Sequence, residues 1–328
     1  MMNFLRKMVR GLAAASLVVL LLLAVGGFSW LMTFGRPATV KSWFDESGLY
    51  AKAPEVLLAE LAKNPDDAEL PLDDPEVRAA IKSAFSPAEL KKLNENLIDG
   101  IYRWLEGKVV QPDFRLDFTP ARDKLVSSLT DYAQRRLKAL PACGRNNLPP
   151  PDDDIFTLEC LPPRTNVDAE VAKELEKVKN SGQLADPIFT VEDLGEGQSS
   201  FKDLESAPDL YKAMRWLPFV FSALVILSAG LIVWLNEDKR KAWRKIARSA
   251  LITGLILLLG AVVTRAVAGS LGKGMADKKD AFNTLGVPLI RTVSNDVTRG
   301  QLWFGAIYTL GGAAIYIWLK KTKPKVSE

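Results

Sequence analysis

Few residue types in this chain could carry out chemistry. Its 328 residues include no histidine and only two cysteines, Cys143 and Cys160. Zinc hydrolase sites and Ser-His-Asp triads both need histidine, so neither can form. The chain also lacks the G-x-S-x-G turn of hydrolases and the glycine-rich loops that hold nucleotide phosphates. The sequence therefore predicts no catalytic, cofactor-binding, metal-binding or nucleic-acid-binding residue, and an enzyme is the minority interpretation.

The two cysteines have a clear use. Both lie in a segment assigned below to the outside of the cell, in a loop rich in proline. An even pair in an oxidising compartment predicts a disulfide between Cys143 and Cys160, and two free thiols are the alternative. In the chain-entropy model, closing this loop contributes about 3 kcal/mol.

Carboxylates cluster at Asp66–Asp67, Asp73–Asp74 and Asp152–Asp154. None of these clusters has the D-x-D-x-D-G spacing of a calcium-binding EF-hand, and acidic turns between helices are usually solvated. Pairs of carboxylates can also serve a glycosidase, but sequence alone cannot identify such a pair. A membrane-anchored hydrolase that uses carboxylates therefore stays open as the second alternative function.

Long apolar runs dominate the architecture. Each is close to the roughly 20 residues that cross a hydrocarbon core of about 30 Å. The runs are Leu12–Phe34, Trp216–Leu235, Ser249–Ala268 and Leu302–Leu319. They predict an all-α membrane protein with four transmembrane helices.

Charge sets the predicted orientation. Short basic segments lie at residues 1–10, 236–248 and 320–328, whereas residues 36–215 carry 33 acidic and 24 basic side chains. Positive residues near the spans favour the cytoplasm. We therefore expect a protein of the plasma (inner) membrane with both termini cytoplasmic. The predicted units are 1–35 (N-terminus and first span), 36–215 (helical extracytoplasmic domain), 216–268 (second and third spans with a basic loop), 269–300 (second extracytoplasmic segment) and 301–328 (fourth span and basic tail).

The first apolar run has a second interpretation, as the core of a cleaved signal peptide. It is longer than such cores, and no A-x-A-like cleavage site follows it. A retained anchor is therefore the prediction, and cleavage would leave three spans with the large domain still outside.

Arg265 is the only charge inside an apolar run, and intramembrane charges often mark a transport pathway. It lies about four residues from the predicted outer end of its span, so its side chain can reach the interface. Arg265 is kept as a possible intramembrane polar site, with Asp296 and Asp209 as candidate partners.

Smaller features at the spans have structural interpretations. Tryptophan and phenylalanine at span ends, such as Trp30 and Phe34, are typical of anchors at the lipid interface. Small residues of the fourth span would let another helix approach closely. These small residues are Gly305, Gly311, Gly312 and Ala313.

The large outer domain is predicted to be mostly helical. Proline follows a capping residue at Asp74, Ser86 and Thr119, which marks three helix starts. Residues 112–118 alternate apolar and charged side chains, which permits a short extended segment without predicting a sheet. Helices are expected at about 52–63, 74–85, 86–107, 119–140 and 166–180, and another at 281–297 interrupted by Pro288.

The stretch from Phe85 through Lys108, followed by Pro112-Asp113-Phe114 and Asp117, resembles an uncharacterised family of bacterial four-pass membrane proteins. Members of that family also have a large helical domain between the first two spans and a loop with proline and cysteine. The resemblance implies the same layout and no activity. A weaker resemblance, in layout only, is to claudin-type tetraspans, whose W-G-L-W-type signature is missing here.

The function expected from these features is non-enzymatic. A domain of about 180 residues outside and short segments inside favour a cell-envelope protein whose outer domain binds a protein or surface partner. A subunit of a transporter or channel is the first alternative. The bilayer is one expected partner, a second protein or a homo-oligomer another, and no cofactor is expected.

Overall fold

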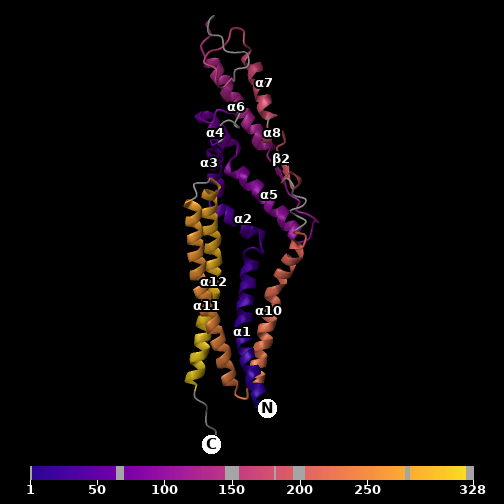
Figure 1. Cartoon of the computed structure of the whole chain (residues 1–328), viewed down its shortest axis with the longest axis vertical. Helices are drawn as coiled ribbons and strands as arrows, with labels where there is room; N and C mark the ends of the chain where they lie inside the picture. The colour runs from indigo at the N-terminus through magenta and orange to yellow at the C-terminus, as the bar shows by residue number, and fades with distance from the viewer. Residues whose placement is uncertain are drawn as a thin grey trace.

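The computed structural model describes residues 2–63, 70–144, 155–180, 182–194, 204–277 and 281–322. The fold is all-α apart from two short strands in this part of the chain. Figure 1 shows a long, narrow molecule, with a bundle of long helices at one end and a head of shorter helices at the other. Both chain termini lie at the bundle end.

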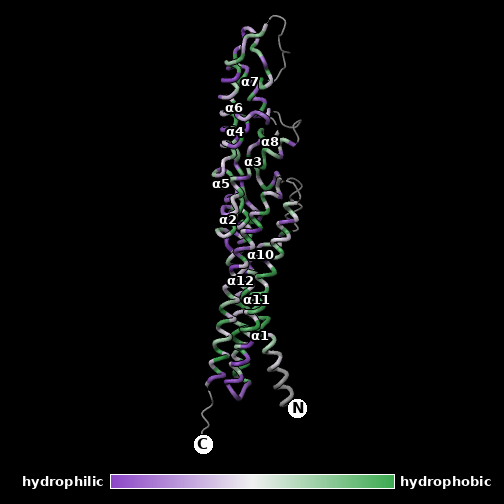
Figure 2. The backbone as a smooth tube through the Cα atoms, turned by 90° about the vertical axis from the view of Figure 1, so that its left-hand side faces the viewer, coloured by the Kyte–Doolittle hydropathy of each residue, from purple (hydrophilic) through white to green (hydrophobic). Residues whose placement is uncertain are grey.

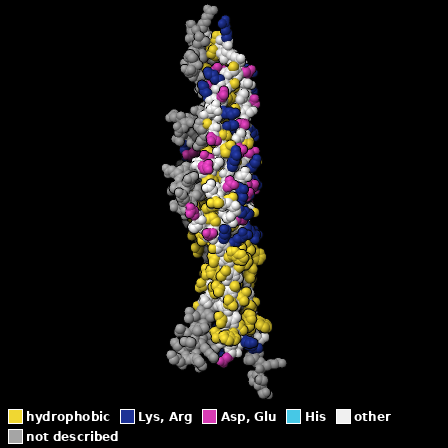
Figure 3. Space-filling view, turned by 90° about the vertical axis from the view of Figure 1, so that its right-hand side faces the viewer, with side chains coloured by type: hydrophobic (Ala, Val, Ile, Leu, Met, Phe, Trp, Pro, Cys, Tyr) yellow, Lys and Arg dark blue, Asp and Glu magenta, His cyan; other side chains and the backbone are white. Residues whose placement is uncertain are grey.

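The bundle is made of four helices, each long and apolar enough to cross a membrane. They are α1 (Met2–Met32), α10 (Ala207–Leu235), α11 (Lys239–Asp277) and α12 (Ala281–Lys321). Their apolar side chains face outward: Ile226 and Leu310 are each 71% exposed and Trp234 is 81% exposed. Figure 3 shows this apolar surface as a continuous band below the charged head, and Figure 2 shows the same division along the backbone. Exposed apolar surface of this extent fits a bilayer as solvent.

α11 and α12 form an antiparallel hairpin that is longer than a membrane is thick. At 1.5 Å per residue, helices of 39 and 41 residues extend about 60 Å, twice the thickness of a hydrocarbon core. Residues 269–277 and 281–300 therefore continue the two helices instead of forming a separate packed segment. The helix expected at 281–297 is present, but the interruption at Pro288 is wrong, because α12 runs through it while packing against α11 and the head.

Small residues allow the hairpin helices to approach closely. A Cβ at Gly305 would lie 3.2 Å from the Gly254 carbonyl oxygen, and one at Gly312 would lie 2.8 Å from the Ala247 carbonyl oxygen. Gly311, by contrast, faces open space. The expected close approach is thus confirmed at two of the glycines, and the partner is α11 of the same chain.

The head contains seven helices in the described residues, and they bury a core centred on α4, α6 and α7. Leu129, Val77 and Val171 are fully buried in it. The helices are α2 (Pro37–Glu46), α3 (Leu49–Leu61), α4 (Pro75–Ala84), α5 (Pro87–Leu105), α6 (Thr119–Ala139), α7 (Val167–Lys179) and α8 (Gly182–Ala185).

Local capping explains most of these boundaries. The Ser86 hydroxyl accepts a hydrogen bond from the Glu89 N–H, as expected from the sequence. Gly107 ends α5 with φ +73°, and the N–H groups of Gly107 and Lys108 bond back to Trp104 and Arg103 in a Schellman motif. The capping role expected of Thr119 is wrong. Thr119 is the first residue of α6, and its N–H donates to the Asp117 carboxylate.

The two strands form a small antiparallel sheet that the sequence did not predict. β1 (Arg115–Asp117) pairs with β2 (Ile188–Thr190), with Leu116 opposite Phe189. The short 3-10 helix η2 (Glu192–Leu194) follows β2. The chain before β1 crosses α5 at Gly100, where a Cβ would lie 2.5 Å from the Asp113 carbonyl oxygen. β1 precedes α6 and β2 follows α8, so this pairing holds together two segments of the head that are far apart in the sequence.

Asp74 caps α4 and holds α6 at the same time. Its carboxylate accepts from the Glu76 and Val77 N–H groups and from the Tyr132 hydroxyl. Burial by itself would raise the pKa of Asp74, but the hydrogen bonds from Tyr132 and the backbone outweigh it and lower the pKa below its ordinary value. The ionised carboxylate therefore stabilises the folded head.

We expect Asp74→Asn to remove part of the acid sensitivity of the head. A carboxyl whose pKa is lowered by folding contributes stability above its unfolded pKa of 3.8, and this contribution is lost as the pH falls through the folded value. Asparagine still caps the helix but does not titrate. The thermal unfolding temperature of the detergent-solubilised variant should therefore fall less between pH 5 and pH 3 than that of the wild type. Asp74→Ala removes the cap and should lower the free energy of unfolding by about 1 kcal/mol at neutral pH.

The matched control for this experiment is Asp73→Asn, which changes the exposed neighbouring carboxylate. Equal acid sensitivity of the Asp74→Asn variant and the wild type would contradict the assigned role of Asp74.

Candidate functional site

The bundle and the head meet at a cluster of aromatic side chains, called here the aromatic junction: Trp30, Phe34, Trp43, Tyr102 and Tyr211. Trp30 packs edge-on against Tyr211 with ring centroids 5.5 Å apart, and Phe34 packs edge-on against Trp43 at 5.1 Å. Tyr102 meets Tyr211 at 6.0 Å. These rings come from α1 and the turn after it, α2, α5 and α10, so the junction ties two bundle helices to two head helices.

Two tyrosine hydroxyls hold the chain just after α1. Tyr102 donates to the Phe34 carbonyl oxygen at 2.5 Å, and Tyr211 donates to the Gly35 carbonyl oxygen at 3.0 Å. Carbonyl groups at the end of a helix lack intrahelical partners and need donors from elsewhere. The junction supplies these donors from α5 and α10, and so fixes the point where α1 turns into the head.

Tyr102 stays neutral at physiological pH. Its burial, together with the neighbouring Tyr211, raises the pKa of Tyr102 to about 12. The hydroxyl therefore remains a hydrogen-bond donor across the physiological range. This property suits a structural clamp, whereas a general base would need a pKa near the working pH.

A hydrogen bond connects the junction to the hairpin. The Trp43 indole N–H donates to the Asp296 carboxylate on α12 at 2.9 Å, and Trp43 is only 3% exposed. The head helix α3 also packs along α12. Through these contacts all four bundle helices are tied to the head, either directly or through a neighbour.

A groove of about 570 Å³ opens beside the junction. Pro37, Tyr102 and Phe114 form its apolar part. Its charged rim is formed by Asp99, Arg103, Glu106, Lys108 and Arg115.

The acidic groups on this rim already have partners. Asp99 pairs with Lys41 at 2.7 Å, and Glu106 pairs with Lys108 at 2.5 Å. Arg103 donates to the Asp113 carbonyl oxygen at 2.8 Å and pairs with the Asp113 carboxylate at 3.7 Å. The Arg115 side chain is exposed on β1, where it interacts with the carboxylate of Asp117. With Lys41 included, four cations face four carboxylates, so the charges at the rim balance.

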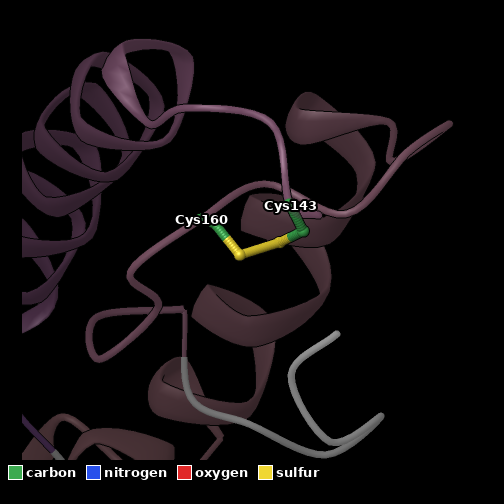
Figure 4. Close-up of a disulfide and its surroundings, with 2 residues drawn as sticks. All are labelled: Cys143 and Cys160. Atoms are coloured by element: carbon green, nitrogen blue, oxygen red, sulfur yellow. A yellow bond between two sulfur atoms is a disulfide. The ribbon is translucent and has the colours of Figure 1, made fainter. Parts of the chain in front are cut away.

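The disulfide expected from the sequence is present, with Cys143 and Cys160 joined and their Cα atoms 4.9 Å apart (Figure 4). Beside it, the Cys143 N–H donates to the Leu161 carbonyl oxygen at 2.9 Å. The bond closes a loop whose returning part places Ile155 and Phe156 in the head core, where Phe156 stacks on Tyr132. Its role in the described structure is thus to fix the far end of the head.

Arg265 is exposed on α11, and the structure does not bring it to either expected partner. Asp296 accepts from Trp43 instead, and Asp209 faces Lys212 at 4.0 Å. An outward arginine near the end of the apolar band can reach the polar interface, as its sequence position indicated.

Of the acidic clusters expected from the sequence, Asp73–Asp74 lies within the described residues, and Asp74 is a helix cap. Asp66–Asp67 and Asp152–Asp154 lie outside the described residues. In the described ranges, no three His, Cys, Asp or Glu side chains lie together as a metal site would need.

The sequence does not predict the junction. Trp30 and Phe34 have the pattern of lipid anchors, and no role is predicted for Trp43, Tyr102 or Tyr211, although Trp43 and Tyr211 lie within about ten residues of apolar runs. That proximity to the apolar runs was the available signal in the sequence.

Comparison with protein-family models, curated proteins and solved structures found no match for this chain.

We expect Trp43→Phe to loosen the head from the hairpin. Phenylalanine keeps a ring against Phe34 but cannot donate to Asp296, and the loss of one hydrogen bond costs about 0.5–1.5 kcal/mol. Thermal unfolding of the detergent-solubilised protein should begin earlier in this variant. Because Trp43 and Asp296 act as a pair, the loss in Trp43→Phe combined with Asp296→Asn should be smaller than the sum of the two single losses.

Trp303→Phe is the control, since Trp303 is 65% exposed on α12. If the two single losses add in full, the hydrogen bond does not couple the head to the hairpin.

Proposed function

We propose that this chain is a non-enzymatic membrane protein of the cell envelope, which holds its helical head outside the cytoplasm and uses it to bind a protein or surface partner. The observation that carries the proposal is the continuity of the bundle with the head. α11 and α12 extend beyond membrane thickness, α12 packs on α3, and the aromatic junction clamps α1 and α10 to α2 and α5. This construction projects the far end of the head away from the bilayer at a fixed angle.

The proposed orientation rests on charge and on the disulfide. The loop between α10 and α11 is basic and lies at the same end as both termini, which favours a cytoplasmic position for that end. The Cys143–Cys160 disulfide lies in the head, and such bonds persist in oxidising compartments. Both arguments favour an extracytoplasmic position for the head.

A transporter or channel subunit is the second candidate, favoured by hydroxyl groups inside the bundle. Within the described residues, Thr253, Thr298 and Thr309 bury their hydroxyls without a hydrogen-bond partner. Thr309 lies against Gly254 across the hairpin. Polar groups buried in a membrane bundle are costly and often line a pathway. A pathway between these helices would need further copies or a partner, because the bundle has only four helices in the described chain.

Photo-crosslinking in cells tests the two candidates against each other. A crosslinking amino acid at the exposed position of Arg78 or Ala172 on the head should capture a reproducible partner if the head is a binding domain. The same probe at Leu310, on the lipid-facing side of α12, serves as the control. Crosslinks only between copies of this chain, at head and bundle alike, would instead favour the transport candidate.

Cysteine labelling tests the orientation. The native cysteines are joined in the disulfide, so a single added cysteine can be labelled selectively without reduction. An impermeant maleimide should label Ala172→Cys in the head of intact cells, and Lys241→Cys in the basic loop only after permeabilisation. The reverse pattern would place the head in the cytoplasm.

A further inference from the structure

Each helix of the bundle has an exposed arginine at the head-side end of its apolar run. None of the four lies more than three residues from that end, and none makes an ion pair within the described residues. They are called here the arginine collar: Arg36 just after α1, Arg215 on α10, Arg265 on α11 and Arg299 on α12.

Contacts within the hairpin bring two of these arginines to one level. The Thr264 hydroxyl on α11 donates to the side-chain oxygen of Gln301 on α12 at 3.2 Å. Arg265 follows Thr264 directly, and Arg299 lies two residues before Gln301. Both arginines are therefore within one helical turn of the same hydrogen bond.

The other two arginines meet where α10 holds the end of α1. The Tyr211 hydroxyl donates to the Gly35 carbonyl oxygen at 3.0 Å. Arg36 follows Gly35 directly, and Arg215 lies one turn along α10 from Tyr211, next to the apolar run. The collar therefore follows the head-side edge of the whole bundle.

Exposed tryptophans show that this edge is the depth of the lipid interface. Trp216 follows Arg215 directly and is 69% exposed, and Trp303 lies one turn from Arg299 and is 65% exposed. Tryptophan concentrates where hydrocarbon meets headgroups. Figure 3 shows Lys and Arg side chains along the upper edge of the apolar band on the face that it draws. Lipid headgroups around the bundle would therefore contact the collar.

Positive charge exceeds negative charge at this level. Within seven residues of the head-side ends of the apolar runs, the described chain has two carboxylates, Asp209 and Asp296. Lys212 faces Asp209 at 4.0 Å, and Asp296 accepts from the Trp43 indole N–H. The groove beside the junction adds no net charge, because its own charges balance. Four arginines are thus left with one carboxylate.

We propose that the arginine collar binds the phosphate groups of anionic phospholipids in the head-side leaflet. A guanidinium group can bind phosphate through parallel hydrogen bonds. Phosphatidylcholine also has a phosphate, but its choline cancels that charge, whereas an anionic lipid offsets the excess charge of the collar. The acyl chains would lie against exposed apolar side chains below the arginines, such as Val262, which is 66% exposed. This proposal goes beyond the proposed function, because it concerns the bundle ends and not the partner of the head.

A fluorophore beside one arginine tests the collar in the full chain reconstituted into phosphatidylcholine vesicles. The native cysteines are joined in the disulfide, so Val262→Cys, one turn from Arg265, can be labelled selectively. A small share of the lipid is phosphatidylglycerol or phosphatidylcholine with a nitroxide on its acyl chain, which quenches a fluorophore that it contacts. The labelled phosphatidylglycerol should be preferred by about fivefold, and added salt should reduce this preference.

Variants at Arg265 then test whether its charge causes the preference. Arg265→Gln should remove most of it, whereas Arg265→Lys keeps the charge and should retain most of it. The matched control is Arg78→Gln combined with Lys124→Gln, which removes two exposed charges from the head and should leave the preference unchanged. If Arg265→Gln fails to fold, as judged by its thermal transition, the salt dependence of the labelled protein with Arg265 intact is the second test.

Three results would overturn the proposal. Equal quenching by the two lipids, at low and high salt alike, would show that the arginines reach the headgroups without selecting their charge. Equal loss of preference in Arg265→Gln and in the head control would show a general effect of protein charge. Exclusion of both lipids from the fluorophore in native membrane vesicles would show that a protein covers the collar instead.

Discussion

The hydrogen bond from Trp43 to Asp296 joins two parts of the chain that are 253 residues apart. Its donor is buried in the head, and its acceptor is a carboxylate on α12 of the bundle. Sliding α12 by one helical turn, about 5.4 Å, would remove the carboxylate from the indole N–H and leave a buried donor unpaired. The bond therefore fixes the height of the hairpin against the head, and the packing of α3 on α12 follows from that register.

The second attachment of the bundle to the head begins with α1. This helix packs along α10 and touches α11, where the Ser249 hydroxyl donates to the Ala14 carbonyl oxygen. Leu17 and Leu21 share a small core with Ile232 and Ala242. Because so few side chains are buried there, most of the apolar surface of the bundle faces outward, and lipid must cover it. The head stays aligned with such a thin bundle because both helix pairs are tied to it separately.

Local signals in the sequence predicted local structure well. Ser86 and Asp74 were recognised as caps because a cap depends on residues only two or three positions away. The pairing of β1 with β2 was not predicted, since the strands lie more than seventy residues apart and their short alternation has no specific partner in one sequence. Thr119 was misassigned because Asp117, two residues earlier, competes for the same backbone donor.

The aromatic junction could not be predicted from the sequence, for a related reason. An aromatic residue at the end of an apolar run is typical of a lipid anchor, and that description holds for Trp216 and Trp234. Trp30 and Phe34 have the same sequence context, but each also packs edge-on against a ring from another element, Trp30 against Tyr211 and Phe34 against Trp43. Only the three-dimensional arrangement distinguishes the two uses of the same residue type.

Tyr102 connects the end of α1 with the head and with α10. Its hydroxyl holds the turn after α1, its raised pKa keeps that hydroxyl protonated, and its ring forms part of the groove wall. Because its hydroxyl and its ring act at the same point, one side chain fixes both the turn after α1 and the contact between α5 and α10.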